Sequence, residues 1–526
     1  MAVGSGSGQP HALHEEQLEL QTRASSPIVV EALVKCIQHY PIQDVSSELV
    51  DGFNHGFRLK YDGPRLATNC KNLVSIKDNE SEALVKVFKE IALGRIAGPF
   101  QDRPLANIRV SPIGLVPKKD GSWRLLHHLS FPEGSSVNDF IDPSACSVQY
   151  SSLDEAIDMI SKLSRGAYLA KMDIKWAFRL LPVNPADFEL LGFQLKGSFF
   201  VDKCLPMGCS YSCALFEKFA TFLEWLVKYR SKLESVVHYL DDFLFGGAKD
   251  NNDCTKLMQE FSGIAYELGV PSVEGKTVGP SHILTFLGYE LNTLELTIWI
   301  PVQKLEELKS LLMGLLGLGK TTLKHLQSVV GVLNFFSRAI PSARAFNRRF
   351  YDAMTGASKP SHHIRLSQGI KDDIRVWLTF LEFFNGCSYF PDSFWLTDSH
   401  LQLYTDSAGQ SNLGCGAVLQ AHWAFFQWPK AWGNSDVMRD LTFLELVPVL
   451  LAMMLWGPQL KSKKIVLNID NQSLVTVLNK KSSKSKRVME LVRPLVLHVM
   501  MYNIQFKAIH IQGIHNSIAD SISRLQ

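Results

Sequence analysis

Two adjacent aspartates, Asp241 and Asp242, stand in the middle of the apolar stretch VVHYLDDFLF at residues 236–245. The valine, tyrosine and phenylalanine residues on both sides predict two strands of a hairpin with the aspartates at its turn. Two ionised carboxylates about 4 Å apart repel each other by roughly 4 kcal/mol at an effective dielectric constant near 20. Divalent cations offset such repulsion, and Mg²⁺ prefers a few carboxylates together with substrate phosphates. For the dipeptide alone, an ordinary solvated turn is the more common interpretation.

A third carboxylate, Asp173, lies inside the apolar segment YLAKMDIKWAFRLLPV at residues 168–183. Taken alone, a buried aspartate can be a structural hydrogen-bond acceptor. Three carboxylates that each stand in an apolar strand indicate instead a two-metal site for phosphoryl transfer.

Four further acidic residues follow in the last quarter of the chain. Asp406 and Asp470 end two predicted strands, and Glu445 and Asp520 lie in predicted helices. Each has a local alternative: Glu445 could close a capping box with Thr442, Asp470 could cap the helix after it, and Asp520 could be a surface residue. These alternatives stay open from the residues alone.

The amino-acid composition limits the classes of protein to which this chain can belong. With 526 residues, 46% of them hydrophobic, the chain can bury a large core in several domains, and 20% charged residues do not indicate disorder. The net charge of +3 does not by itself indicate a nucleic-acid partner. Nine cysteines without C-x2-C pairs argue against a disulfide framework or a zinc site and fit a reducing compartment.

No secretory signal is recognisable at the N-terminus, and the apolar run at residues 446–456 is too short to span a bilayer. We therefore expect an intracellular protein, cytoplasmic or nuclear and not secreted, without membrane contact.

Changes of pattern along the chain predict a multidomain protein that combines α+β and α/β domains. A Gly/Ser-rich flexible tail precedes an N-terminal extension that holds an amphipathic helix at residues 82–94. A strand-rich region, a helical region, a linker and a second strand-rich region follow. The predicted segments are 1–27, 28–94, 95–295, 296–354, 355–396 and 397–526.

The order of the motifs resembles that of reverse transcriptases. SPIGLVPKKDGSWRLLHHLS at 111–130 precedes the strand with Asp173, and LPMGCSYS at 205–212 precedes Y-x-D-D at 239–242. The sequences of residues 125–141 and of LPMGCS resemble those of the DIRS-like retrotransposons more than those of gypsy-like elements. DIRS-like retrotransposons move with a tyrosine recombinase. The resemblance implies a right-hand polymerase with fingers and palm at 95–295, a thumb at 296–354 and a connection at 355–396.

The resemblance also implies roles for individual residues. Asp173, Asp241 and Asp242 would hold two Mg²⁺ ions, with Mn²⁺ as the alternative, and the backbone carbonyl of Ile174 would be a further ligand. Phe178 would lie under the sugar and exclude a 2′-hydroxyl, although core packing explains a phenylalanine there equally well.

Cationic residues in two segments would hold the substrate. Lys118, Lys119 and Arg124 belong to a predicted hairpin and would bind the incoming triphosphate, but which lysine does so stays open. Lys276 is a candidate acid for the pyrophosphate leaving group. The alternative for all four is an ordinary solvated lysine or arginine.

The LPMG motif departs from relatives that carry glutamine at its third position. Met207 replaces that glutamine and Gly208 follows it. Because a thioether is a poor hydrogen-bonding group, contact with the sugar or the template would be apolar.

The late carboxylates Asp406, Glu445, Asp470 and Asp520 match the pattern of ribonuclease H in order and on the expected elements. This resemblance implies a ribonuclease H-like domain at 397–526, with a second metal pair for water attack on an RNA phosphodiester. The ending H-N-x-x-A-D-x-x-S-R is shared with retrotransposon enzymes.

Three features of this segment need a structural test. Pro448 lies inside the predicted helix of Glu445 and should kink it. His515 precedes Asp520 on a short loop, and we expect it to orient the loop rather than to assist product release. The basic run at 480–487 could contact a hybrid but is more often a solvated loop.

The sequence therefore predicts an RNA-directed DNA polymerase with a linked ribonuclease H. Its partners would be an RNA template, a DNA primer, the RNA–DNA hybrid, deoxynucleoside triphosphates and other retroelement proteins. One alternative is a domesticated or decayed element that only binds nucleic acid. Another is a chain with one active domain, for example if Pro448 displaces Glu445.

Overall fold

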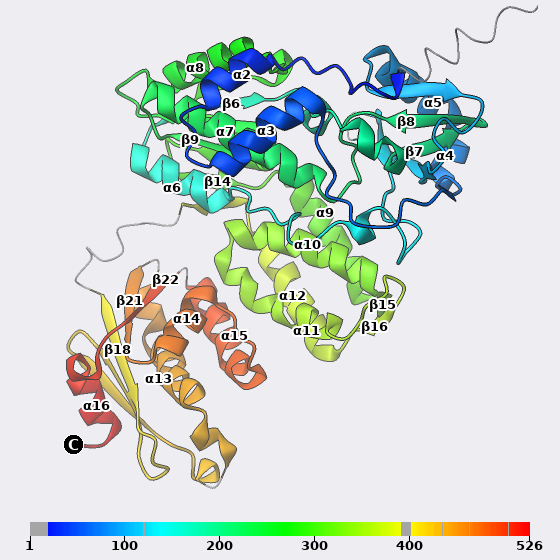
Figure 1. Cartoon of the computed structure of the whole chain (residues 1–526). Coiled ribbons are helices and arrows are strands. Elements are labelled where there is room, and N and C mark those ends of the chain that lie inside the picture. Colours follow the sequence, from blue (N-terminus) through cyan, green and yellow to red (C-terminus); the bar gives the residue numbers. More distant parts are fainter. Residues whose placement is uncertain (1–18, 119–120, 391–400, 434, 462, 503) are drawn as a thin grey trace, which may run out of the picture. The chain divides into compact units, whose positions relative to one another are not determined.

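The computed structural model describes residues 19–118, 121–390, 401–433, 435–461, 463–502 and 504–526. The chain divides into two compact units, residues 1–287 and residues 288–526 (Figure 1). Both units combine helices with sheets, which confirms the prediction of a mixed α/β multidomain chain.

A four-stranded antiparallel sheet in the order β11-β6-β10-β9 is central to the first unit. It consists of β6 (Tyr168–Asp173), β9 (Val236–Tyr239), β10 (Asp242–Gly247) and β11 (Val278–Ser281). Helix α7 (Ser212–Ser231) contacts β9, and α8 (Asp253–Leu268) contacts β10 and β6. Because α7 is apolar around most of its circumference, it is buried as a core helix. Strand β12 (Ile283–Phe286) ends the unit.

The other part of the first unit holds a five-stranded sheet in the order β1-β3-β7-β8-β2 and a separate hairpin, β4-β5. The strands are β1 (Thr68–Asn69), β2 (Ile96–Phe100), β3 (Arg109–Val110), β4 (Ile113–Pro117), β5 (Trp123–His127), β7 (Gly192–Leu195) and β8 (Ser198–Asp202). Helices α4 (Val74–Asp78) and α5 (Glu80–Ala92) pack beside them. Helix α5 is the amphipathic helix that the sequence predicts at 82–94.

The N-terminal extension is built into the first unit. It holds α2 (Val30–Ile37) and α3 (Gln43–His55). Helix α6 (Leu153–Leu163) lies outside the extension, later in the same unit. The predicted flexible tail reached residue 27, but its described part, residues 19–27, does not fit that prediction. Leu20 and Ala24 are buried, and the Ser26 hydroxyl donates to the carbonyl oxygen of Leu180. Apolar contacts therefore hold this segment on the domain; residues 1–18 lie outside the described residues.

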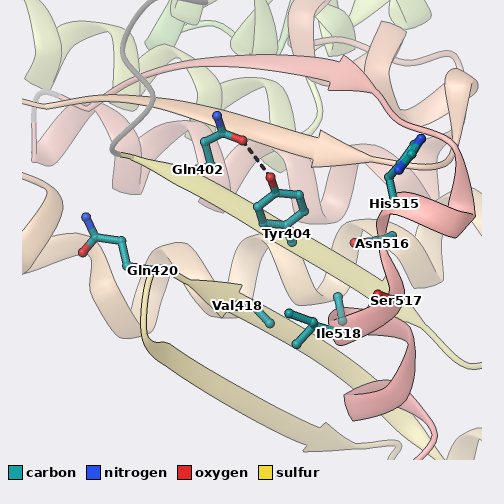
Figure 2. A pocket seen from close by; sticks show the side chains of 9 residues that line it. Gln402, Tyr404, Val418, Gln420, His515, Asn516, Ser517 and Ile518 are labelled. Carbon is teal, nitrogen blue, oxygen red and sulfur yellow. Dashed lines mark hydrogen bonds between the residues drawn. The ribbon is translucent and has the colours of Figure 1, made fainter.

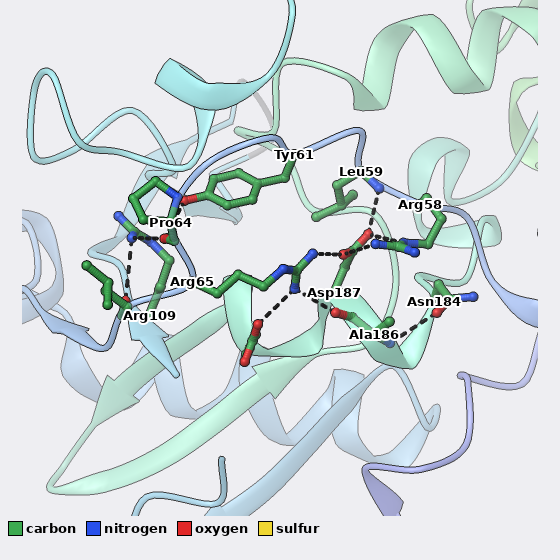
Figure 3. A network of polar contacts seen from close by, with 11 residues as sticks. Arg58, Leu59, Tyr61, Pro64, Arg65, Arg109, Asn184, Ala186 and Asp187 are labelled. Atoms are coloured by element: carbon green, nitrogen blue, oxygen red, sulfur yellow. Dashed lines mark hydrogen bonds and ion pairs between the residues drawn. The ribbon is translucent and has the colours of Figure 1, made fainter. Parts of the chain in front are cut away.

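A buried aspartate joins the extension to the 3₁₀-helix that precedes β7. Asp187, on the 3₁₀-helix η3 (Pro185–Leu190), is fully buried. Its carboxylate accepts hydrogen bonds from Arg58 at 2.8 Å, from Arg65 at 2.6 Å and from the backbone N–H of Leu59 at 2.9 Å (Figure 3). Since each of its oxygens has a charged donor, the carboxylate stays ionised, and these bonds hold its pKa below the ordinary value despite burial.

The first part of the second unit contains the helices of the predicted thumb and connection: α9 (Val302–Leu316), α10 (Leu323–Ala339), α11 (Arg348–Met354) and α12 (Gln368–Phe383). Strands β13 (Tyr289–Asn292), β14 (Thr297–Trp299) and β17 (Cys387–Tyr389) pair in that order, and β15 (Lys320–Thr322) pairs with β16 (His363–Arg365). Residues 355–390 are therefore more than the predicted linker, because they supply a helix and two paired strands.

The last part of the second unit is a five-stranded mixed sheet in the order β20-β19-β18-β21-β22. Its strands are β18 (Gln402–Ser407), β19 (Gly414–Leu419), β20 (His422–Gln427), β21 (Lys464–Ile469) and β22 (Gln505–His510). Its helices are α13 (Leu441–Trp456), α14 (Gln472–Lys480), α15 (Lys486–Met501) and α16 (Ser517–Ser523). Figure 1 shows α13 and α14 on one side of this sheet and α16 on the other.

Helix α13 continues through Pro448 as a single helix. Most of its residues are buried, so packing on both sides holds the turn that lacks the proline N–H. The expectation that the apolar run at 446–456 is too short to span a bilayer is wrong for the folded helix, because residues 441–460 are long and apolar enough to cross a membrane. Two-thirds of that stretch is buried inside the fold.

The Asp187 contacts generate a stability prediction. Replacing Asp187 by alanine leaves two guanidinium groups and a buried N–H without their acceptor, and we expect the free energy of unfolding to fall by about 3 kcal/mol. Chemical denaturation at neutral pH measures this change.

Glu189→Ala is the matched control, because this partly exposed carboxylate also pairs with Arg65 and should contribute under about 1 kcal/mol. Since the pKa of Asp187 is lowered, its contribution is present above about pH 4 and is lost as the pH falls further. Equal losses in the two variants would contradict a special role for Asp187.

Candidate active sites

The first carboxylate cluster forms where β10 lies between β9 and β6. Asp242 is paired with Asp173 on β6 and with Tyr239 on β9. Asp241 lies in the turn after Leu240, whose φ of 54° is left-handed, and its carbonyl oxygen accepts from the N–H of Ile174 at 2.9 Å. The pairing of β10 with β6 thus brings Asp173 next to Asp241 and Asp242, which follow it in the chain by about 70 residues.

Burial and mutual repulsion dominate the electrostatics of this cluster. Burial, reinforced by the neighbouring Asp173, raises the pKa of Asp241, while Lys276 and Arg124 oppose the rise. Burial also raises the pKa of Asp242 to about 6, with Lys171 lowering it and Asp173 and Asp241 raising it. The Oδ1 atom of Asp242 is buried without a hydrogen bond. These carboxylates therefore lack the positive charge that would keep them all ionised.

Lys276 supplies part of that charge. It lies on the 3₁₀-helix η4 (Glu274–Lys276), and its Nζ is 2.8 Å from Oδ2 of Asp173. This hydrogen bond raises the pKa of Lys276, so the lysine stays protonated at neutral pH. Lys276 is exposed, as the alternative of a solvated lysine expects, but it also pairs with Asp173.

A cavity of about 360 Å³ opens beside the carboxylates. Most of the predicted substrate and metal residues line it: Lys118, Arg124, Asp173, Ile174, Met207, Asp241 and Lys276. Asp242, Phe178 and Gly208 are not among its lining residues, and Lys119 lies outside the described residues.

Phe178 and Gly208 do not line the cavity, and each packs against another element of the first unit. The Phe178 ring packs edge-on against Phe216 of α7, with ring centroids 5.6 Å apart. Gly208 has a φ of 120°, and a Cβ there would lie 1.9 Å from the carbonyl oxygen of His127. The preceding residue, Met207, accepts a hydrogen bond from the N–H of His127 through its carbonyl oxygen. Close backbone approach therefore requires the glycine, and the side chain at 207 is not needed for this contact.

A histidine that the sequence analysis did not single out supports the hairpin. His238 on β9 is buried, and its ring nitrogens lie 2.5 Å from Glu224 and 3.2 Å from Glu217, both on α7. Burial lowers the pKa of His238, but the two carboxylates outweigh it and raise the pKa to about 9. The signal in the sequence was a lone histidine in an apolar strand, whose partners only the tertiary structure reveals.

The second cluster lies at the carboxyl ends of two parallel strands. Tyr404 on β18 is in register with Asn468 on β21, so Asp406 and Asp470, each two residues further on, reach the same end of the sheet. Glu445 approaches from α13. Asp406, Glu445 and Asp470 each present an oxygen, and these oxygens lie within 4.8 Å of one another. Pro448 therefore does not displace Glu445.

Burial makes this second cluster strongly repulsive. It raises the pKa of Glu445 to about 8, with the charges of Asp406 and Asp470 adding to the rise. It also raises the pKa of Asp406 to about 6. Two hydroxyl groups donate to the cluster: Ser407 to Glu445 at 2.8 Å and Ser523 to Asp406 at 2.6 Å. The Oε2 atom of Glu445 is buried without a donor.

The local alternatives for two of these acids are wrong. Asp440, not Thr442, caps α13, and Glu445 accepts from Ser407 instead of closing a capping box. Asn471, not Asp470, caps α14. In both places a neighbouring residue provides the cap and leaves the acid free for the cluster.

Asp520 stands apart from the other three acids. It lies in the first turn of α16, is partly exposed and pairs with Arg524 at 2.7 Å. Its charge still contributes to the raised pKa of Asp406 and Asp470. It is therefore near the cluster without belonging to its tightest group.

The loop before Asp520 is held by its asparagine. Asn516 is buried, and its side-chain amide donates to the carbonyl oxygen of Thr405 at 2.9 Å, next to Asp406. His515 lines a cavity of about 450 Å³ with Gln402 and Tyr404 (Figure 2), and none of the four acids is among the residues that line it. The pattern quoted above contained Asn516 and Ser523, but only the folded chain reveals what they contact.

The predicted basic run at 480–487 is partly engaged. Arg487 pairs with Asp436 at 2.7 Å, and the Nζ of Lys481 lies 4.9 Å from the centre of the Phe506 ring. Lys484 and Lys486 are exposed and line a cavity that also includes three arginines. The run is thus neither fully solvated nor fully paired.

A family model matches the part of the chain that holds the first cluster. The family model "Reverse transcriptase (RNA-dependent DNA polymerase)" matches residues 116–291, which contain all three aspartates of the first cluster. Residues 116–291 are therefore similar to the reverse transcriptase family.

Individual relatives cover part of the chain. The Gag-Pro-Pol polyprotein of Simian retrovirus SRV-1 is 26% identical over 270 residues, which are 49% of this chain and 14% of the polyprotein. The Pro-Pol polyprotein of Simian foamy virus type 1 is 25% identical over 248 residues, 47% of this chain and 19% of the polyprotein. The chain thus matches less than a fifth of these relatives' length.

Solved structures of a foamy viral protease–reverse transcriptase are also similar. One, in complex with double-stranded DNA, covers 97% of this chain and 84% of its own, with 14% identity and a TM-score of 0.48. Another, in complex with an RNA/DNA hybrid, covers 97% and 64%, with 15% identity and a TM-score of 0.48.

Both clusters fit divalent cations. Their ligands are carboxylate oxygens, which suit Mg²⁺ or Mn²⁺. Each cluster contains a buried oxygen without a hydrogen bond: on Asp242, where Oδ1 lies 3.5 Å from the Nζ of Lys171, and on Glu445 in the second unit. Among the described residues, the aspartates of the first cluster form no group as tight as that of Asp406, Glu445 and Asp470.

The His238 contacts generate a prediction about pH. Because its pKa rises from 6.5 to about 9 on folding, the protonated histidine stabilises the fold below pH 6.5, and this contribution is lost as the pH rises through 9. We expect a loss on the order of 2 kcal/mol between pH 6 and pH 10 that is absent from His238→Gln. Denaturant unfolding across this range measures the difference between the two proteins.

His55→Gln is the control, since this exposed histidine pairs only with Asp51 on the same helix. If His238→Gln and the unmodified protein lost the same stability on alkalinisation, the assigned ion pairs would be refuted.

Proposed function

We propose that this chain is an RNA-directed DNA polymerase with a linked ribonuclease H. The observation that carries the polymerase assignment is the reverse transcriptase match over residues 116–291, within which Asp173 and Asp242 are paired and Asp241 lies in the adjoining turn. The cavity beside this cluster is lined by acidic and by basic side chains. This lining supports a nucleoside triphosphate as the substrate.

In the polymerase, Asp173, Asp241 and Asp242 would hold two divalent ions, with the carbonyl oxygen of Ile174 as a further ligand. When bound, such ions activate a hydroxyl nucleophile and neutralise charge on phosphates. Lys118 and Arg124 would bind the triphosphate from the β4-β5 hairpin.

Two further residues would select the substrate and assist the leaving group. Phe178, held by Phe216, would exclude a 2′-hydroxyl and so select deoxynucleotides. Lys276, protonated through its contact with Asp173, would donate its proton to the departing pyrophosphate.

The ribonuclease H assignment rests on the second unit. Three acids from two parallel strands and a helix converge within 4.8 Å, and Asp520 adds a fourth nearby. Such a group suits two-metal hydrolysis of a phosphodiester, and the reverse transcriptase domain on the same chain makes an RNA–DNA hybrid the natural substrate.

The finer assignment is to a retroelement of the DIRS-like group. It rests on the sequence motifs at residues 125–141 and 205–210. The chain would then work on an RNA template with a DNA primer, together with other proteins of the element.

Separating the two activities tests the proposal. On a labelled RNA template with a DNA primer and Mg²⁺, we expect Asp241→Asn to lower primer extension by about a hundredfold or more and to leave hybrid cleavage intact. Asp470→Asn should do the reverse, because each substitution removes a ligand from one cluster only. Extension and cleavage are read in the same reaction.

Each variant controls for the folding of the other. A folded wild-type chain that binds the hybrid but does not extend the primer would support the decayed or domesticated alternative. Cleavage that survives Asp470→Asn would move the nuclease away from the second cluster.

A further inference from the structure

Helix α5 contributes to the polymerase cavity although the sequence analysis assigned no chemistry to its segment. Lys86, Lys89 and Glu90 line the cavity of about 360 Å³ together with Asp173 and Asp241. A spacing of three and four residues places these side chains on one face of a helix. The adjoining face, with Ala83 and Val87, is buried in an apolar core.

Ion pairs fix α5 to the turn that follows Asp173. Glu90 accepts a hydrogen bond from Arg179 at 3.0 Å, and Arg179 also pairs with Asp202 at 2.6 Å. Just after the helix, the guanidinium of Arg95 lies 3.9 Å from the centre of the Trp176 ring. Trp176 lines the cavity, so the last turn of α5 is held against the cavity wall.

The cations of the cavity fall into two groups. Lys276 is paired with Asp173, and Arg179 is paired with Glu90 and Asp202. Within the part of the chain that the structure describes, Lys86 and Lys89 have no ion-pair partner, and Glu90 on the same helix is occupied by Arg179. Lys86 and Lys89 therefore face a cavity whose carboxylates need metal ions, as do Lys118, Arg124 and Lys175, which likewise have no ion-pair partner among the described residues.

We propose that Lys86 and Lys89 bind the β- and γ-phosphates of the incoming deoxynucleoside triphosphate and hold the leaving pyrophosphate. This inference rests on the proposed polymerase function and adds residues to its substrate site. Lysines are suitable because they interact with phosphate oxygens as mobile point charges.

The reaction defines what these lysines hold. The 3′ oxygen of the primer forms a bond to the α-phosphorus, and its proton passes to water. The bond between that phosphorus and the oxygen bridging to the β-phosphorus breaks, and its electron pair leaves with the pyrophosphate. Negative charge thus grows on the group next to Lys86 and Lys89, so their attraction increases as the bond breaks.

The test compares Lys86→Ala/Lys89→Ala with Lys35→Ala, a control at an exposed lysine on α2. In primer extension, we expect the double variant to raise both the KM for deoxynucleotide and the inhibition constant of inorganic pyrophosphate by about tenfold. Lys35→Ala should change neither. Lys86→Arg/Lys89→Arg should restore part of the pyrophosphate inhibition.

Calorimetric titration with inorganic pyrophosphate and Mg²⁺ reads binding without turnover. If the wild-type chain extends primers and the double variant keeps the same inhibition constant, the inference fails while the polymerase function stands. If the wild-type chain does not extend primers, the polymerase function fails, and the titration alone decides whether these lysines bind pyrophosphate. Should the alanine variant unfold, Lys86→Gln/Lys89→Gln keeps the side-chain length and undergoes the same measurements.

Discussion

Repulsion between buried carboxylates is the constraint on which both candidate sites depend. Burial raises the pKa of Asp242 and Asp406 to about 6 and that of Glu445 to about 8. Such groups are costly to keep ionised unless cations or donors compensate them. The fold supplies only partial compensation, through Lys171, Lys276 and two serine hydroxyls, and leaves one buried oxygen in each cluster without a hydrogen bond. The positive charge that is still needed to keep these carboxylates ionised is of the kind that divalent metal ions supply.

The two units reach the same chemistry by different pairings. In the first unit, antiparallel neighbours place Asp173 opposite Asp242, and the turn adds Asp241. In the second, parallel strands bring the carboxyl ends of β18 and β21 together, and α13 adds Glu445. In both cases the carboxylates come from rigid elements whose register is set by buried apolar side chains, because a slip of one residue would turn each acid to the other face.

Supporting residues lie one layer behind the acids. His238 is clamped by two glutamates of α7, Asn516 anchors the loop before Asp520, and Glu90 ties α5 to Arg179. None of these three carries a recognisable role in the sequence, since each partner lies 14 or more residues away in the chain. These polar groups have lost their contacts with water and depend on their protein partners. If one partner is removed, the other stays buried without a hydrogen bond, and its desolvation free energy is no longer offset.

The sequence by itself determined the identity and order of the acids, the strands that carry them and the amphipathic helix of α5, because periodicity and turn residues are local properties. Only the tertiary structure decided that residues 19–27 pack on the domain, that Asp440 and Asn471 rather than Thr442 and Asp470 make the helix caps, and that α13 passes through Pro448 with Glu445 in place. The physical reason is that burial, ion pairing and the choice among neighbouring hydrogen-bond partners depend on residues brought together from distant parts of the chain, whose proximity no local pattern encodes.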